Sequence, residues 1–298
     1  MNTEANRKTE WVVGIGEALW DILPEGRKIG GAPANFAYHM SQFGLRSYAV
    51  SAVGDDEAGR ELRNQLREKR VGHMLETVPF PTGTVEVTLD GAGIPSYEIR
   101  QGVAWDNIPF TPQIEELARH TRAACFGSLA QRSPVSHRTI GRFLETMPDG
   151  EGQYKVFDIN LRQHFYTQQV VEESLRKCNI LKINDEELAV VGGMFGMEGM
   201  QPGEQCRTLL DRYGLRIVIL TCGGIRPRHP VIYPHAAGRS GRHGRRRGLV
   251  HGIVPGRPAL GARHRGSTQA GRGCRGPRLL AARRHAPAAG TVYRSAAQ

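Results

Sequence analysis

The sequence predicts a three-layer α/β/α fold with a doubly wound, mostly parallel sheet and a small β-hairpin lid. Three observations carry this prediction. Short apolar strands alternate with amphipathic helices from Trp11 to Thr221, the order typical of parallel sheets covered by helices. Residues 84–100 interrupt that order with two alternating strands around a Gly-Ala-Gly turn, a hairpin pattern. With 298 residues, the chain is long enough to bury a large core.

In the first half of the chain we expect strand, helix, strand and helix in that order. Residues 11–16 form an apolar run, and apolar residues at helical spacing follow over 34–43, ended by Gly44. A second apolar run covers 45–53, and the acidic residues 55–57 suit the start of a helix that continues to about Arg70.

The second half repeats this alternation after the hairpin. We expect strands over 123–127, 155–159, 180–183 and 216–221. Helices are predicted over 112–120, 135–147, 168–177, 185–191 and 204–213. In such a sheet, ligands lie at the carboxyl ends of the strands.

Charge divides the chain into a predicted domain over 1–224 and an aberrant tail over 225–298. The tail holds 16 Arg and no Lys, Asp or Glu, so residues 1–224 carry a net charge of −5 although the whole chain carries +11. The tail is also rich in Gly and Pro, with little apolar periodicity, which is typical of poorly ordered chain. The basic excess therefore lies outside the predicted α/β domain.

The composition also indicates a compartment. Five scattered cysteines without C-x-x-C spacing indicate reduced thiols rather than disulfides or a metal site. Residues 1–10 are polar, and no apolar run reaches the roughly 18 residues that a membrane span needs. We therefore expect a cytoplasmic protein that has no membrane partner.

Two adjacent glycines, Gly30 and Gly31, precede the first predicted helix. They have no Cβ, so a ligand can approach the main chain there, while Pro33 and Asn35 begin the helix. An ordinary tight turn between a strand and a helix explains the same residues. The functional interpretation therefore depends on the rest of the chain.

Polar residues gather where the predicted strands end. Glu17 and Asp21 follow the first strand, and the groups 158–162, 184–187 and 221–224 follow three others. Carboxylates accept hydrogen bonds from sugar hydroxyls and hold hydrated Mg²⁺, and arginine binds phosphate. Helix capping explains each group separately, but their shared edge suggests phosphoryl transfer to a small polyol.

Together these motifs make the chain similar to the ribokinase-like carbohydrate kinases of the PfkB type, and within them to the fructokinase branch. The resemblance rests on Gly16-Glu17-Ala18-Leu19 with Asp21, Gly30-Gly31-Ala32-Pro33-Ala34-Asn35, Gly54-Asp55-Asp56 with Gly59, Asp158-Ile159-Asn160-Leu161-Arg162, Asn184 with Glu187, and Thr221 with Gly223. It implies a sugar kinase that uses ATP and Mg²⁺ and binds its sugar between the lid and the sheet edge. Such lids often pair in homodimers of the family.

The resemblance also implies roles for individual residues. The expected sugar-binding residues are Glu17, Asp21, Gly30, Gly31, Asn35, Tyr97, Arg100 and Arg162, with Arg162 near the transferred phosphate. The expected nucleotide- and phosphate-binding residues are Asn160, Asn184, Thr221 and Gly223, and Glu187 is expected near Mg²⁺.

One signature of the family has no counterpart in this chain. Family members carry Asp-Thr-x-Gly-Ala-Gly-Asp beyond this point, where the glycine N–H groups bind the transferring phosphate and the last aspartate is the base. Residues 241–252 occupy that part of the chain. Read one base out of frame, their codons can spell Ala-Asp-Thr-Val-Gly-Ala-Gly-Asp-Ser-Phe-Thr-Ala. We therefore interpret the tail as a frameshift that begins near residues 223–227.

Two other functions compete with an impaired kinase, one of them a sugar-binding pseudo-kinase without catalysis. The other is a protein whose arginine-rich tail binds nucleic acid without sequence preference. The sequence does not identify the sugar among fructose, ribose, 2-keto-3-deoxygluconate and nucleosides.

Overall fold

The structure, a computed structural model, describes residues 11–23, 25–89, 95–222 and 230–235, without the side chains of 87–97. These residues all belong to one compact unit within 1–238. The predicted site residue Gly223, the side chain of Tyr97 and most of the predicted tail lie outside the described residues.

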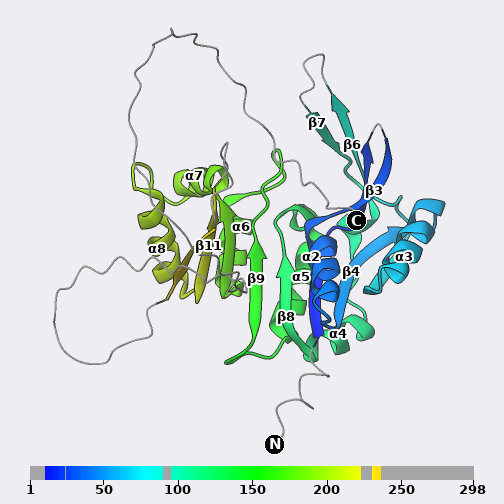
Figure 1. The fold of residues 1–298 in the computed structure, drawn as a ribbon, viewed down its shortest axis with the longest axis horizontal. Helices are drawn as coiled ribbons and strands as arrows, with labels where there is room; N and C mark the ends of the chain where they lie inside the picture. The colour runs from blue at the N-terminus through cyan, green and yellow to red at the C-terminus, as the bar shows by residue number, and fades with distance from the viewer. Residues whose placement is uncertain (1–10, 24, 90–94, 223–229, 236–298) are drawn as a thin grey trace, which may run out of the picture. The chain divides into compact units, whose positions relative to one another are not determined.

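The main sheet has eight strands in the order β12-β11-β10-β9-β8-β1-β4-β5 (Figure 1). Its strands are β1 (Trp11–Ile15), β4 (Ser47–Gly54), β5 (Gly72–Val78), β8 (Thr121–Phe126), β9 (Tyr154–Asp158), β10 (Ile180–Asn184), β11 (Ile217–Thr221) and β12 (Val231–Pro234). Neighbouring strands are parallel, except that β12 is antiparallel to β11. The predicted doubly wound, mostly parallel sheet is confirmed.

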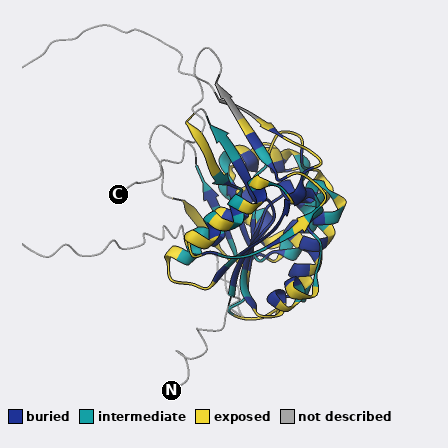
Figure 2. Ribbon diagram, turned by 90° about the vertical axis from the view of Figure 1, so that its right-hand side faces the viewer, coloured by how far each residue is buried: buried dark blue, intermediate teal, exposed yellow. Residues whose placement is uncertain are grey.

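Helices cover both faces of this sheet (Figure 2). They are α2 (Ala32–Gln42), α3 (Glu57–Glu68), α4 (Pro112–Arg119), α5 (Pro134–Thr146), α6 (Gln168–Lys177), α7 (Asp185–Met194) and α8 (Pro202–Tyr213). Two consecutive residues of β4 show the division, since neighbouring side chains of a strand point to opposite faces. Ala49 belongs to the buried cluster that α2 and α3 cover, whereas Val50 belongs to the cluster that α4 and α5 cover.

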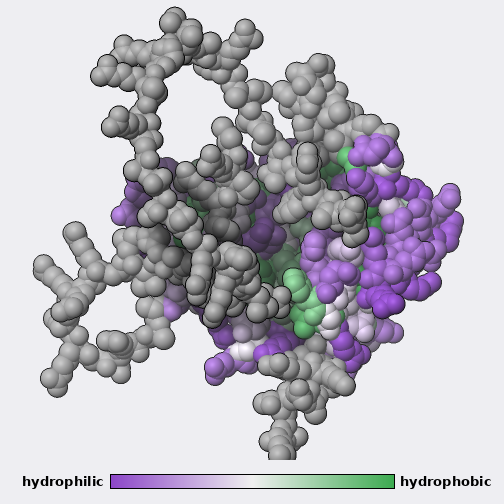
Figure 3. Space-filling model, in the orientation of Figure 1, coloured by the Kyte–Doolittle hydropathy of each residue, from purple (hydrophilic) through white to green (hydrophobic). Residues whose placement is uncertain are grey.

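Helix α3 shows how the sequence places a helix on the sheet. Its N-cap, Asp56, accepts a hydrogen bond from the Gly59 N–H at 2.7 Å, as N-cap carboxylates do. Leu62 and Leu66, one turn apart, are buried against the sheet. The outer side of α3 is hydrophilic (Figure 3).

The lid is a second sheet of four strands in the order β3-β2-β6-β7. These are β2 (Leu19–Leu23), β3 (Gly26–Gly30), β6 (Thr84–Leu89) and β7 (Pro95–Ile99). The predicted hairpin is confirmed as the antiparallel pair β6 and β7. We did not predict β2 and β3, which double the width of the lid and carry Asp21 and Gly30 into it.

Two further strands were missed in the sequence. We predicted no strand directly after the helix that ends at about Arg70, although β5 begins at Gly72; a Cβ there would lie 2.7 Å from the Tyr48 ring. β12 lies within the predicted tail, so the expectation of poor order does not extend to Val231–Pro234. Among the described helices, none is both long and apolar enough to cross a membrane.

Candidate active site

The candidate site lies at the carboxyl ends of β1, β9, β10 and β11, and the lid strand β2 follows soon after β1 in the chain. Because these strands are parallel in one sheet, their carboxyl ends share an edge. The ends of β10 and β11 are adjacent, since Asn184 and Thr221 are paired residues. Glu17 follows β1 directly, and Arg162 lies in the loop after β9. The fold therefore brings these predicted residues to one edge.

The two glycines of the turn are required by contacts within the protein. Gly31 is the N-cap of α2 at φ +104°, and a Cβ there would lie 2.3 Å from the Glu17 carbonyl oxygen. A Cβ on Gly30 would lie 2.4 Å from the Asp21 Oδ2. Backbone packing against Glu17 thus explains Gly31, whereas at Gly30 the nearest atoms belong to the side chains of Asp21 and Leu19.

Glu17 is almost completely buried, with 1% of its surface exposed. Its Oε1 accepts a hydrogen bond from the Ala32 N–H at 3.3 Å, while Oε2 is buried without a partner among the described residues. Burial raises the pKa of Glu17 to about 7. The assignment of Glu17 to the sugar stays a prediction, and its nearest partner in the structure is the turn that begins α2.

Asp21 and Arg162 come from distant elements and influence each other electrostatically. Asp21 lies on β2, and burial raises the pKa of its carboxyl group while the positive charge of Arg162 opposes that rise. The same guanidinium lowers the pKa of Glu17, although burial dominates there. Arg162 is exposed, so it is available to a ligand at the sheet edge.

The loop after β9 has an unusual backbone. Asn160 and Gln163 have φ values of +47° and +48°, a left-handed conformation in which residues other than glycine are uncommon. The buried Ser128 hydroxyl donates to the Asn160 carbonyl oxygen at 3.3 Å. Strained loops of this kind occur often at functional sites, and this one presents Arg162.

Glu187 connects the loops that follow β9 and β10. Its Oε1 accepts the Leu161 N–H at 3.1 Å and its Oε2 accepts the Asn184 N–H at 3.0 Å. In turn, the Glu187 N–H donates a hydrogen bond to the Asn184 Oδ1 at 2.7 Å, which completes a capping box at the start of α7. Burial raises the pKa of Glu187.

The donor set at this edge fits a hydrated Mg²⁺ rather than a dedicated metal cage. Each carboxylate oxygen of Glu187 already accepts one backbone N–H, and each keeps a lone pair for a metal-bound water. No group of three His, Cys, Asp or Glu within the described residues could hold a metal ion. Mg²⁺ usually keeps several waters and binds nucleotide phosphates, so Glu187 suits contact through water.

The remaining predicted residues with described side chains lie on or next to three separate elements. Asn35 is exposed in the first turn of α2, and its N–H donates to the Gly31 carbonyl oxygen at 2.9 Å. Arg100 is exposed at the end of β7 and lies 3.8 Å from Glu86. Thr221 is half-buried at the end of β11.

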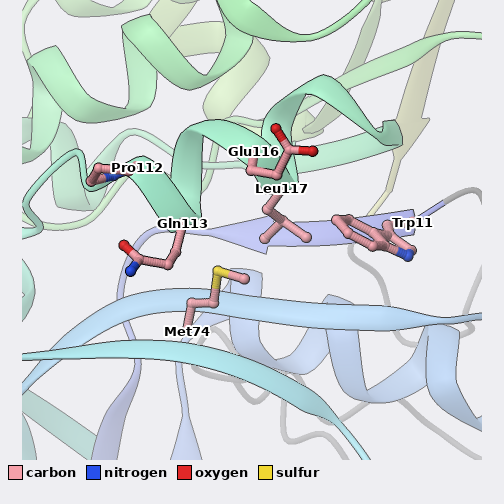
Figure 4. Close-up of a pocket in the computed structure, with 6 residues that line it drawn as sticks. All are labelled: Trp11, Met74, Pro112, Gln113, Glu116 and Leu117. Atoms are coloured by element: carbon pink, nitrogen blue, oxygen red, sulfur yellow. The ribbon is translucent and has the colours of Figure 1, made fainter.

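A separate pocket of about 340 Å³ lies far from this edge (Figure 4). It is lined by Trp11, Met74, Pro112, Gln113, Glu116 and Leu117. Trp11 is the first residue of β1, whereas Glu17 follows its last residue. The pocket is therefore at the opposite end of the strand from the candidate site.

Comparison with known proteins identifies the family of this chain. The pfkB family carbohydrate kinase model matches residues 25–224. The chain belongs to the pfkB family of carbohydrate kinases. The family match ends at the residue where the charge pattern changes.

Relatives of this pfkB chain differ in the substrates that their names state. A fructokinase from Klebsiella pneumoniae is 31% identical over 199 residues, which cover 61% of this chain and 62% of that protein. A nucleoside kinase from Methanothermobacter thermautotrophicus is 27% identical over 186 residues, which cover 60% of this chain and 58% of that protein. The chain thus spans about three fifths of the length of these relatives.

Solved structures show the same fold. A Vibrio cholerae fructokinase crystallised with fructose, ADP and potassium ion superposes with a TM-score of 0.61 at 20% identity, over 76% of this chain and 74% of that chain. The predicted ribokinase-like architecture of this pfkB chain is confirmed.

One cluster at the foot of the lid was missed in the sequence. Arg132 and Asp106 form a buried ion pair beneath Arg100. The signal was present as an arginine between the predicted strand that ends at 127 and a Ser-Pro helix start, but an isolated arginine gives no indication of burial.

Proposed function

We propose that residues 1–224 are the sugar-binding part of an ATP-dependent carbohydrate kinase, and that the sugar is fructose. The relation between Asp21 and Arg162 carries the proposal, because the positive charge of Arg162, exposed at the sheet edge, acts on the Asp21 carboxylate of the lid. The carboxylate suits sugar hydroxyls, and the guanidinium suits the phosphate that is transferred to one of them. The Klebsiella fructokinase supports this choice of sugar.

ATP would bind where β10 and β11 end. Asn184 and Thr221 are adjacent there, and Asn160 and Glu187 lie in the loop and helix beside them. Mg²⁺ would neutralise charge on the phosphates of the nucleotide, and Glu187 would contact its waters. The assignment of Gly223 to the nucleotide also stays a proposal.

The chain as written should transfer phosphate poorly. It lacks the Gly-Ala-Gly-Asp sequence, and loss of a general base costs about 10²–10⁴ in rate while loss of an anion-hole donor costs about 10²–10³. We interpret the tail as the product of a shifted reading frame. Sequencing the gene across the codons for 222–253 tests this, because codons 241–253 that cannot spell the signature one base downstream contradict it.

Calorimetry with fructose, run on the full chain without ATP, tests the sugar site. Asp21→Asn removes a charge that the site uses, so we expect the Kd to rise about tenfold or more. Asp55→Asn is the matched control, since Asp55 is exposed and, among the described residues, pairs with Arg60 at 3.4 Å. Equal affinity of the Asp21 variant and the wild type would remove the support for this site.

A sugar-binding pseudo-kinase is the second candidate. Its support is that Asp21, Gly31 and Asn35 are all present while the catalytic signature is missing. Fructose binding with no ADP release would favour it. Titration with a nucleoside in place of fructose tests the substrate suggested by the Methanothermobacter relative.

A cytoplasmic location and a homodimer through the lid remain predictions, and sedimentation of the full chain tests the dimer.

A further inference from the structure

Arg132 and Asp106 form a buried ion pair outside the predicted site. Arg132 ends the 3₁₀ helix η2 (Leu129–Arg132), which follows β8, and Asp106 lies in η1 (Ala104–Asn107), which follows the lid. Their side chains are only 8% and 7% exposed. Arg132 Nε donates to Oδ1 at 2.8 Å and Nη2 donates to Oδ2 at 3.0 Å. Such a two-point pair fixes the plane of the guanidinium.

The same guanidinium lies over two aromatic rings, one from η1 and one from the loop after β9. Its Cζ lies 4.0 Å from the centre of the Trp105 ring and 4.5 Å from the centre of the Phe165 ring. Trp105 belongs to η1, whereas Phe165 belongs to the loop after β9. Arg132 therefore joins the segment behind the lid to the loop that carries Arg162.

Backbone hydrogen bonds extend this connection in both directions. Arg132 Nη2 also donates to the carbonyl oxygen of Arg100, the residue that follows β7 at the foot of the lid. On the other side, the Phe165 N–H donates to the Arg162 carbonyl oxygen at 3.0 Å. A single buried side chain thus contacts the lid directly and the Arg162 loop through Phe165.

We propose that Arg132 is a positioning residue that fixes the lid relative to the Arg162 loop and thereby sets the affinity for the sugar. A buried ion pair is weak support for stability, because an uncharged replacement of the pair often folds equally well. The geometry that this ion pair imposes on the lid and on the Arg162 loop explains its presence better than a contribution to stability does. The effect on sugar affinity rests on the proposed function; the effect on the two segments does not.

The test uses the double variant Arg132→Met, Asp106→Asn, which leaves no unpaired buried charge. The amide oxygen that replaces the Asp106 carboxylate can still accept the Val103 N–H, which Asp106 Oδ2 accepts at 3.2 Å. Arg142→Met is the control, because Arg142 also lies over an aromatic ring, Phe110 at 4.2 Å, but is exposed on α5. Both variants are compared with the wild-type full chain.

Amide hydrogen exchange is the first readout. In the double variant we expect exchange about tenfold faster in residues 95–100 and 160–165, with α8 unchanged. The control should exchange like the wild type in all three segments. Unchanged exchange in either target segment of the double variant overturns the proposal.

Fructose affinity is the second readout. We expect the Kd of the folded double variant to rise about tenfold or more, since the lid and the Arg162 loop would no longer be held together. An unchanged Kd with faster exchange would mean that Arg132 is merely structural, which also overturns the proposal. If the wild type binds no fructose, the proposed function fails and the exchange comparison alone decides the role of Arg132.

Discussion

Glu17 gives the sharpest prediction, because its burial has a measurable consequence for stability. In the folded protein burial raises its pKa from 4.5 to about 7, so the folded state binds this proton more tightly than the unfolded chain does. The contribution of Glu17 to the free energy of unfolding must therefore fall as the pH rises from about 4.5 to about 7. Above that range the contribution is constant. The difference between the two pKa values corresponds to about 3 kcal/mol.

Glu17→Gln isolates this contribution. Glutamine has nearly the same shape and can still accept the Ala32 N–H, which Glu17 Oε1 accepts at 3.3 Å, but it does not titrate. Any cost of the buried amide is independent of pH. We therefore expect the variant to gain up to about 3 kcal/mol on the wild type between pH 4.5 and pH 8, whatever their difference at pH 4.5.

Urea unfolding of both chains at five or six pH values measures this difference directly. Glu198→Gln is the control, because Glu198 is exposed and its replacement should change stability by less than about 0.5 kcal/mol at any pH. A difference between wild type and Glu17→Gln that is constant across the range refutes the reasoning. It would mean that Glu17 stays ionised in the fold or that water reaches Oε2.

Three further predictions concern other features of the chain. Gly31→Ala should destabilise the protein by more than Gly44→Ala in urea unfolding. Both glycines have a positive φ, but only a Cβ at Gly31 would meet a neighbouring oxygen, at 2.3 Å. Equal effects would contradict this, because they would leave only the backbone cost of about 1–2 kcal/mol. Asn184→Ala should cost about 1 kcal/mol through loss of the capping box, measured by thermal unfolding, and a neutral result would contradict that role. A coupled assay with fructose and ATP should detect little or no ADP release, and a turnover of about 1 s⁻¹ would contradict the loss of the catalytic signature.

The main sheet and the helices that cover it could be predicted because their residues carry local signals. The α6 helix begins after the N-cap Thr167 and its predicted range, 168–177, matches the structure. In contrast, β2 and β3 were hidden, since Gly26–Gly30 has mostly exposed, polar residues and no strand alternation. The two strands pair as an antiparallel hairpin with Asp21 opposite Lys28, a register that no local pattern of apolar residues indicates.

The sequence allowed us to propose sugar-binding residues but not the contacts that support them. Motif spacing indicated Asp21 and Arg162, but the burial of Glu17 depends on Pro33 and Ala32 packing against the end of β1. Arg132 was missed for the same reason, because its partners lie 26 to 33 residues away in sequence. Local sequence patterns place residues on elements, whereas burial and pairing follow from how the elements pack.

The sugar half and the nucleotide half of the proposed site depend on contacts from different parts of the chain. On the sugar side, the lid and the turn before α2 rest on contacts that are complete before residue 224. At the other end of the sheet, the last strand is β12, where Val231 is 42% and Ile232 is 53% exposed. Exposed apolar residues on an edge strand indicate a surface that further chain would ordinarily cover. Because β12 itself lies in the tail that we interpret as out of frame, its exposed apolar residues and the missing phosphate-binding glycines would have one cause, whereas the residues proposed for the sugar all precede the shift.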